Sequence, residues 1–321
     1  MNILVATNHL RMVGGTENYS YALIEELLRR NHQVEYFSFE KGKVSDLIEH
    51  NLKVPFFTGN KSYDLILANH NTIVDSLWKF GFIIQTCHGI YPLLEQPSLY
   101  ADAHVSISNE VQVHLASKGF NSKIIYNGIN CDRFTISNPI NERLTSVASF
   151  CQSDEANELV EKACEVLNIK FLRVSKFEEN FWNIEKVINR ADLIVGLGRS
   201  AYDAMACGRP VVIFDKRKYS NNYGDGYVKD NLGFIMLNNC SGRYYKQNYT
   251  VSSLVEEFLK YDPKDGLYLR NFALRYLNIK NQVDSYLNYA DLSKELDYKS
   301  IYKIRAKKAV YRFLKKFVKS H

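Results

Sequence analysis

The most constraining feature of the sequence is the stretch Ala191–Asp215, which reads as a strand, a turn, a helix and a second strand. The apolar run Leu193–Leu197 is long enough for a buried strand and too short for a helix. A glycine-containing turn follows, and Ser200 is predicted to cap a helix of very small residues that can lie close to a sheet. A glycine and a proline then end the helix before the apolar run Val211–Phe214. The pattern predicts a βαβ unit in a parallel sheet.

The turn of this unit is a candidate anion-binding site. Gly196 and Gly198 would expose backbone N–H groups at the N-terminus of a helix, where an anion is held favourably. Asp203 lies about one turn into the helix, close enough to meet the sugar of a nucleotide whose phosphates rest on the turn. The alternative is a tight corner without a ligand, because a glycine pattern alone is weak evidence for binding.

The second half of the unit resembles a segment of a known protein family. The residues Asp203–Val212 read Asp-Ala-Met-Ala-Cys-Gly-Arg-Pro-Val-Val, and they resemble the donor-site segment of the retaining glycosyltransferases of family 4. In that family, which has the GT-B fold, the usual form is Glu-Ala-Met-Ala-x-Gly-x-Pro-Val-Val after a glycine-rich turn. Two positions depart from it. The family's ribose-binding glutamate is Asp203, and its earlier glutamate, eight positions before, falls on Val195.

Three other segments resemble the same family, in the family's order. Gly14, Gly15 and Glu17 match a Gly-Gly-x-Glu segment whose backbone approaches the donor phosphates. His88 lies in a Thr-Cys-His-Gly sequence after a predicted strand, similar to a family segment whose histidine faces the sugar. Residues 127–134 resemble the Asn-Gly-Val-Asp-x-x-x-Phe segment that closes the first domain. Taken without the resemblance, the glycines can simply shape a turn and the histidine can be structural.

A third departure concerns the donor's phosphates. The family carries an arginine and a lysine after the first strand of its second domain, but residues 148–156 contain neither cation. Because a diphosphate leaving group needs electrostatic stabilisation, we expect Arg199, at the glycine turn, to hold its oxygens instead. The alternative is a surface arginine paired with a carboxylate.

Short apolar runs alternate with helical patterns along most of the chain, which predicts an α/β fold. The resemblance implies the GT-B architecture, with two Rossmann-like doubly wound domains facing across a cleft. We expect an acceptor-side domain over residues 1–140, a nucleotide-sugar domain over 141–285 and a helical tail over 286–321. Within the second domain, 219–227 is predicted to be a loop and 232–237 a strand.

Composition fits a soluble protein. Hydrophobic residues make up 46% of the chain and charged residues 24%, and no apolar run approaches the length of a membrane span. The N-terminus reads as a first strand and lacks the basic region and cleavage site of a signal peptide. Cysteines without paired spacing fit a reducing cytosol, so a cytoplasmic location is expected. The six cysteines show no paired spacing, and the sequence has no Asp-x-Asp cluster. We therefore expect neither a metal nor a cofactor beyond the donor.

The basic character of the chain is concentrated at its C-terminus. Residues 301–321 hold eight lysines or arginines and no acidic residue, which leaves 33 basic and 35 acidic residues elsewhere. Five apolar residues recur there at helical spacing: Ala306, Val310, Phe313, Leu314 and Phe317. A basic amphipathic helix suits an anionic membrane at the inner face. The alternatives are a helix packed on the body or a nucleic-acid patch, although no other part of the chain suggests a nucleic-acid module.

The resemblance implies a hexosyltransferase that takes a sugar from a nucleotide diphosphate and retains its anomeric configuration. With the basic amphipathic tail, we expect the acceptor to be a lipid-linked or surface-polysaccharide precursor. His88 and Arg199 are the predicted catalytic residues. The predicted donor-binding residues are Gly14, Gly15, Glu17, Gly196, Gly198, Arg199, Ser200 and Asp203. Two alternatives stay open: a nucleotide-sugar epimerase, and an inert binding protein with the GT-B fold.

Overall fold

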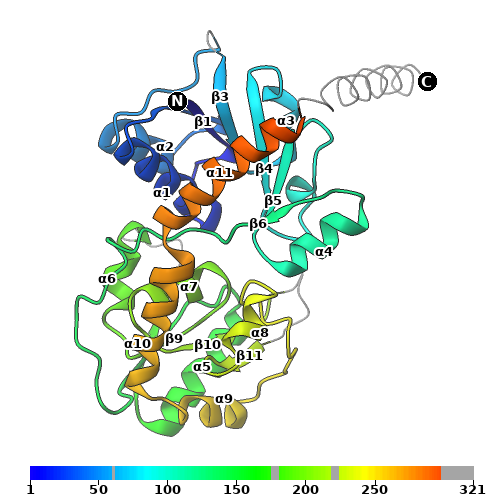
Figure 1. The fold of residues 1–321 in the computed structure, drawn as a ribbon. Helices are drawn as coiled ribbons and strands as arrows, with labels where there is room; N and C mark the ends of the chain where they lie inside the picture. The colour runs from blue at the N-terminus through cyan, green and yellow to red at the C-terminus, as the bar shows by residue number, and fades with distance from the viewer. Residues whose placement is uncertain (60–61, 175–180, 218–223, 298–321) are drawn as a thin grey trace.

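The computed structural model describes residues 1–297 apart from 60–61, 175–180 and 218–223. The chain forms two α/β halves, each built on its own sheet (Figure 1). The first sheet has the strand order β2-β1-β3-β4-β5-β6, and all of its strands are parallel. Its strands are β1 (Asn2–His9), β2 (Gln33–Glu40), β3 (Tyr63–Ala68), β4 (Gly81–Cys87), β5 (Ala103–Ser106) and β6 (Lys123–Ile124).

The second sheet has the order β11-β10-β9-β7-β8, with β11 antiparallel to β10 and the other strands parallel. Its strands are β7 (Ser146–Ser149), β8 (Lys170–Arg173), β9 (Leu193–Gly196), β10 (Val211–Phe214) and β11 (Gly224–Tyr227). In each sheet the first strand lies between the second and the third, so the chain winds outward in both directions. This is the doubly wound arrangement expected from the sequence, and ligands bind where the winding reverses.

Helices cover both sheets, and apolar residues of helices and strands are buried together in separate cores. Around the first sheet lie α1 (Gly15–Arg29), α2 (Lys43–Asn51), α3 (Asn71–Leu77), the 3₁₀ turn η1 (Leu93–Glu95) and α4 (Asn109–Ser117). Around the second lie α5 (Asp154–Leu167), η2 (Phe181–Asn183), α6 (Ile184–Ile188), α7 (Arg199–Ala206), α8 (Leu232–Met236), α9 (Val251–Phe258) and α10 (Pro263–Phe272). The π-helical segment η4 (Ala273–Leu277) leads into α11 (Ile279–Asp297).

Helix α11 returns from the second sheet to the first and lies along α1 (Figure 1). At the crossing, Asn278 pairs with Ile129 of the connecting segment, so the two passages of chain run side by side. Val283, Tyr286 and Ala290 are buried in the core of the first sheet. The helix therefore belongs to the packing of the first half. The predicted boundaries at residues 140 and 285 stay predictions, and the basic amphipathic helix predicted within residues 301–321 lies outside the described residues.

Two local predictions in the second half are wrong. Leu232–Met236 is the helix α8, not a strand, because Leu232, Ile235 and Met236 are buried at helical spacing while Phe234 is exposed. A six-residue apolar run does not distinguish a strand from a short buried helix. Gly224–Tyr227, predicted as part of a loop, is the edge strand β11, in which Gly226 adopts a φ of 77° next to a register shift.

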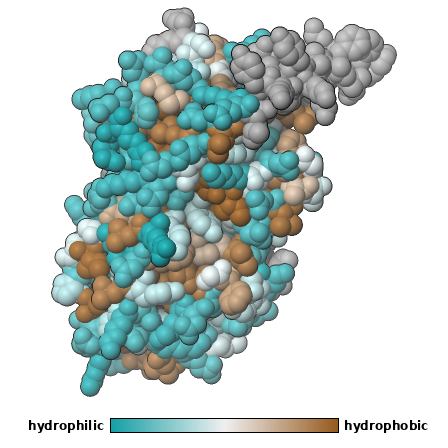
Figure 2. All heavy atoms as spheres, viewed as in Figure 1, coloured by the Kyte–Doolittle hydropathy of each residue, from teal (hydrophilic) through white to brown (hydrophobic). Residues whose placement is uncertain are grey.

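Hydrophilic residues cover much of the face seen in Figure 2, with apolar residues in scattered patches between them. Within the described part of the chain, no helix combines the length and the apolar character that crossing a bilayer requires.

Candidate functional site

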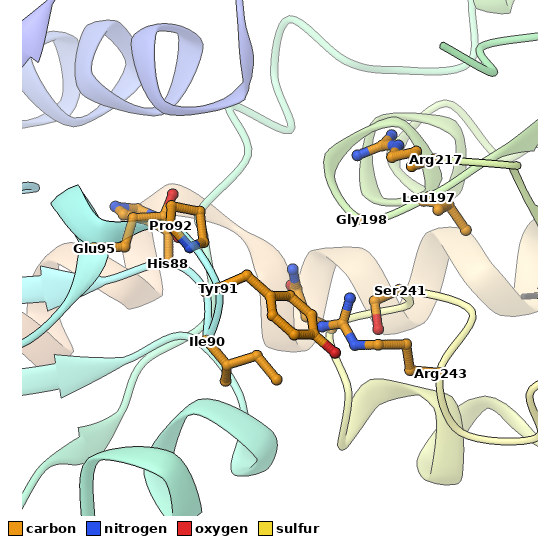
Figure 3. Close-up of a pocket in the computed structure, with 12 residues that line it drawn as sticks. His88, Ile90, Tyr91, Pro92, Glu95, Leu197, Gly198, Arg217, Ser241 and Arg243 are labelled. Carbon is orange, nitrogen blue, oxygen red and sulfur yellow. The ribbon is translucent and has the colours of Figure 1, made fainter. Parts of the chain in front are cut away.

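A cavity of about 190 Å³ lies between the two halves, at the carboxyl ends of β4, β9 and β10 (Figure 3). One wall comes from the loop after β4, and the other comes from the turn after β9, the segment after β10 and the loop after α8. The lining residues are His88, Gly89, Ile90, Tyr91, Pro92 and Glu95 on the first wall, and Leu197, Gly198, Arg217, Asn239, Ser241 and Arg243 on the second.

His88 directly follows β4 and is partly buried in the first wall. Its Nε2 lies 3.0 Å from Oδ1 of Asn69, and its ring packs edge-on against Tyr19 with 5.6 Å between centroids. Burial lowers the pKa of His88 to about 3, with a smaller contribution from His70, so the imidazole is neutral near pH 7. A neutral ring in this position can donate or accept hydrogen bonds, but it does not supply a positive charge.

The glycine turn on the second wall is held by close packing. A Cβ on Gly196 would lie 3.1 Å from Cβ of Ser200 and 3.2 Å from Cβ of Phe150, closer than most side-chain contacts. Gly198 has a φ of 56°, a left-handed conformation that glycine adopts without strain. Its N–H donates to the carbonyl of Cys240 at 2.9 Å, which ties the turn to the loop after α8.

Helix α7 begins at Arg199, two residues earlier than a cap at Ser200 predicts, and Gly198 occupies its N-cap position. The prediction that Ser200 is the N-cap is therefore wrong. Ser200 lies in the first turn, and its Cβ packs over Gly196. The physical reason is the left-handed Gly198, which already turns the chain into the helix and needs no side-chain cap. The turn still presents the N-terminus of an eight-residue helix beside the cavity.

Asp203 and Arg199 form an ion pair on one face of α7, with 2.8 Å between Oδ1 and Nε. Arg199 Nη1 also donates to the carbonyl of Gly128 at 3.1 Å, in the segment that connects the two sheets. Burial raises the pKa of Asp203, and the neighbouring Arg199 opposes that rise. The two side chains are only 7% and 12% exposed, and they stand next to the cavity without lining it.

The N-terminus of α1 faces the N-terminus of α7 across the two halves. A Cβ placed on Gly15 would lie 3.8 Å from Cβ of Arg199. Glu17 folds back over Gly14, where an added Cβ would lie 2.4 Å from its Oε2, and Glu17 Oε1 lies 3.0 Å from His9 Nε2. The predicted Gly14–Glu17 segment and the predicted α7 turn thus lie together, although neither Gly14 nor Glu17 lines the cavity.

Glu95 is a cavity residue that the sequence did not indicate. It lies in η1 with His88 and Pro92 nearby (Figure 3). A Cβ on Gly89 would be 2.4 Å from Glu95 Oε2, so the glycine makes room for the carboxylate. Burial raises the pKa of Glu95 to about 7. A carboxyl group that titrates near neutrality is a candidate for donating or accepting a proton, or for binding a hydroxyl group.

Arg217 and Arg243 are also cavity residues that the motifs missed. Arg217 Nε lies 2.8 Å from Oδ2 of Asp215, and Arg243 Nε donates to Oε1 of Glu110 at 2.9 Å. Arg217 follows a strand end, which is the one sequence signal that points to it. Arg243 lies in an irregular loop and has no such signal.

The loop that carries Arg243 has an unusual backbone. Asn239 and Cys240 are consecutive non-glycine residues with φ values of 57° and 48°. Left-handed residues of this kind cost free energy and persist where the surroundings hold them. Tyr202 of α7 donates to Oδ1 of Asn239 at 2.8 Å, and the carbonyl of Cys240 accepts the Gly198 N–H. The loop and the α7 turn therefore form one interlocked wall.

No cluster of three or more histidine, cysteine or acidic side chains in the described ranges is arranged to hold a metal ion.

Comparison with family models finds no match, and comparison with curated proteins finds none either. Solved structures match over nearly the whole chain. A glycosyltransferase from Rickettsia africae has a TM-score of 0.56 at 12% identity, covering 91% of this chain and 98% of its own. The catalytic domain of starch synthase IV from Arabidopsis thaliana, bound to ADP and acarbose, has a TM-score of 0.53 at 11% identity, covering 91% and 99%.

A UDP-N-acetylglucosamine 2-epimerase is similar to the same degree, with a TM-score of 0.54 at 9% identity and coverage of 94% and 97%. These likenesses extend across both sheets, and they confirm the GT-B fold predicted from the sequence. At such low identity they establish the fold alone, because one fold carries many activities.

Proposed function

We propose that the chain is a glycosyltransferase that takes a nucleotide diphosphate sugar as donor and transfers the sugar to a glycan or lipid-linked acceptor. The cavity between the two sheets carries this proposal. It joins the loop after β4, with His88, to the glycine turn at the N-terminus of α7. The carboxyl ends of parallel strands are where α/β folds bind ligands, and a helix N-terminus favours phosphate.

In this proposal the second wall holds the nucleotide. Gly198 lets the phosphates approach the backbone, Gly196 leaves room for Ser200 and Phe150 to pack behind the turn, and Asp203 accepts hydrogen bonds from the ribose. Arg199 keeps the Asp203 carboxylate oriented through the pair described above. The facing N-terminus of α1, with Gly14, Gly15 and Glu17, would approach the phosphates from the first half.

His88 would face the transferred sugar. Because its imidazole is neutral and its Nε2 is 3.0 Å from Asn69 Oδ1, we assign it a hydrogen-bonding role, not that of a cation. The resemblance to family 4 implies that the anomeric configuration of the sugar is retained.

Two large apolar side chains are exposed on the segment that forms the first wall, which supports a lipid-linked or membrane-borne acceptor. Leu93 is 84% exposed and Tyr91 52% exposed, and both belong to the segment that forms the first wall. The proposed attachment of residues 301–321 to the inner face of a membrane concerns a part of the chain outside the described residues.

Two measurements test the proposal. The first is a thermal-shift series with UDP, GDP, ADP and CDP, in which one nucleotide should raise the melting temperature. The second incubates the protein with nucleotide sugars and analyses the products. Release of nucleotide diphosphate supports a transferase, interconverted sugars would indicate an epimerase, and binding without turnover would indicate an inert protein. If no nucleotide binds, the proposal is wrong.

A further inference from the structure

The cavity poses an electrostatic problem that the sequence motifs leave open. When a sugar leaves a nucleotide diphosphate, negative charge develops on the phosphate oxygen, and positioned donors must stabilise it. Residues 151–156, which follow β7, contain no lysine or arginine. Two of their backbone N–H groups are also bound by a protein carboxylate: Asp215 accepts from the N–H of Gln152 at 3.0 Å and of Ser153 at 3.3 Å. The Asp215 carboxylate therefore occupies the position after β7 where a bound phosphate would otherwise accept these hydrogen bonds.

Two arginines stand on the wall next to it. Arg217 comes from the segment after β10 and Arg243 from the loop after α8, and both line the cavity together with Gly198 (Figure 3). Their sequence positions are unrelated, so only the fold brings them to one wall. The N-terminus of α7 adds its partial positive charge between two elements that each supply a guanidinium.

Each guanidinium group is held by an ion pair with a carboxylate, Arg217 by Asp215 and Arg243 by Glu110. Asp215 holds Nε of Arg217 at 2.8 Å and also accepts the N–H of Lys216 at 2.8 Å, so its charge is shared among several donors. Glu110 holds Arg243 through two contacts, and the Arg243 guanidinium lies 5.5 Å from the ring centroid of Tyr91. An arginine fixed in this way loses little side-chain entropy when it binds an anion, and its planar fork matches phosphate geometry.

We propose that Arg217 and Arg243, together with the N-terminus of α7, bind the diphosphate of the donor and stabilise it as it leaves. This inference rests on the proposed function. In the step, the bond between the anomeric carbon and the phosphate oxygen breaks, and its electron pair stays on that oxygen. The acceptor hydroxyl oxygen forms the new bond to the anomeric carbon, and its proton passes to the departing phosphate. The arginines take no proton, since their role is to neutralise charge and fix the phosphate in position.

The assignment differs from the role expected for Arg199. Arg199 stands at the same turn, but its Nε and Nη1 contact Asp203 and the Gly128 carbonyl. It orients the ribose-facing carboxylate, whereas Arg217 and Arg243 lie on the cavity surface.

The test is isothermal titration of the full-length protein with the nucleoside diphosphate that binds in the thermal-shift series, and with the corresponding monophosphate. Arg217→Gln and Arg243→Gln should each lower the affinity for the diphosphate about 10- to 100-fold, the scale of a lost charged hydrogen bond. The affinity for the monophosphate should fall much less. Arg143→Gln is the matched control, because Arg143 is exposed and precedes β7. It therefore lies at the amino end of that strand, whereas the cavity lies at the carboxyl ends.

A second variant, Glu110→Gln, separates the loss of an anion-binding arginine from the loss of the ion pair that joins the two halves. Arg243→Gln also removes the contact to Glu110, so Glu110→Gln, which keeps the arginine, should lose less affinity than Arg243→Gln. Equal losses in these two variants would overturn the role of Arg243. Diphosphate affinity unchanged in both arginine variants would overturn the inference while leaving the proposed function intact.

Inorganic pyrophosphate serves as a probe that does not depend on the base. If pyrophosphate binds in an arginine-dependent manner and no nucleotide binds, the anion site stands and the proposed function fails. If neither pyrophosphate nor any nucleotide binds, both fail.

Discussion

Glu110 and Arg243 form a two-point ion pair that joins the first half of the molecule to the second beside the cavity. The distances are 2.9 Å from Arg243 Nε to Oε1 and 2.5 Å from Nη2 to Oε2, and each side chain is 16% exposed. Asn238 donates to the same carboxylate at 3.2 Å, and the N–H of Glu110 donates to the carbonyl of Leu237. The first turn of α4 is thus attached to the loop that carries a cavity arginine.

We predict that Glu110→Gln destabilises the protein, since it removes the charge from a largely buried, bidentate contact. The expected loss is about 1 kcal/mol, or ~2–4 °C in melting temperature. Differential scanning fluorimetry checks it. Asp154→Asn, which removes the partner of Arg173 from a more exposed pair, should change the melting temperature by less. Equal shifts in the two variants would show that the Glu110 contact adds no more stability than an exposed ion pair does.

Asp203→Ala is expected to weaken nucleotide binding by about 1–3 kcal/mol, because it removes a charged hydrogen-bond acceptor. It also leaves Arg199 without the carboxylate it now contacts. Calorimetry on the folded variant gives the affinity. Arg199→Lys keeps the charge but loses the fork, so it should lower donor turnover as well. An unchanged affinity in Asp203→Ala would remove Asp203 from the site.

His88→Ala should lower turnover more than nucleotide affinity, because the base and phosphates are held by the other wall. With a pKa of about 3, His88 stays neutral across the working range. The wild-type rate should therefore show no titration of this group between about pH 5 and 9. Kinetics of donor hydrolysis at several pH values checks both points. A variant that loses binding and turnover in parallel would point to a structural histidine.

The carboxyl group of Glu95 makes the stability of the protein depend on pH. Burial raises its pKa from 4.5 to about 7, so the folded state holds the proton more tightly than the unfolded chain. Below pH 4.5 the group is protonated in both states and costs nothing. The cost grows as the pH rises from 4.5 to 7 and is complete above 7, where it reaches up to about 3 kcal/mol.

Glu95→Gln should accordingly raise the melting temperature at pH 8 and change it little near pH 4, as measured by scanning fluorimetry across that range. Glu158→Gln removes the same charge from an exposed site on α5 and should give no such pH-dependent gain. A gain that is equal at both pH values would exclude titration of Glu95 as the cause.

Deleting residues 301–321 should release the protein from anionic vesicles, since this segment carries eight cations and no anion. Donor hydrolysis in solution should be largely kept. Salt should weaken attachment of the full-length chain only in part, because it screens charge and leaves apolar burial in place. Vesicle sedimentation with and without the segment measures this. Equal binding would contradict a membrane role, and a much lower melting temperature would assign the segment to the fold.

The sequence by itself determined the local units. Short apolar runs, glycines and a proline define the βαβ unit at 191–215, because burial and backbone sterics act over a few residues. For the same reason His88 could be placed at the end of a strand. The turn was located correctly, although the helix begins two residues earlier than predicted, because Gly198 occupies the N-cap position.

Only the tertiary structure decided which distant side chains meet. Arg217, Arg243 and Glu95 come from three separate loops, and no periodicity relates them. Arg199 does pair with a carboxylate, which was the alternative considered from the sequence, and Asp203 lies four residues further along the same helix. Its contact with the Gly128 carbonyl, 71 residues away in the chain, depends on the tertiary structure. Likewise, α11 reads as an ordinary helix, but its burial against α1 depends on the chain crossing back beside Ile129. Contacts between residues far apart in the chain follow from the packing of whole elements, which local patterns do not contain.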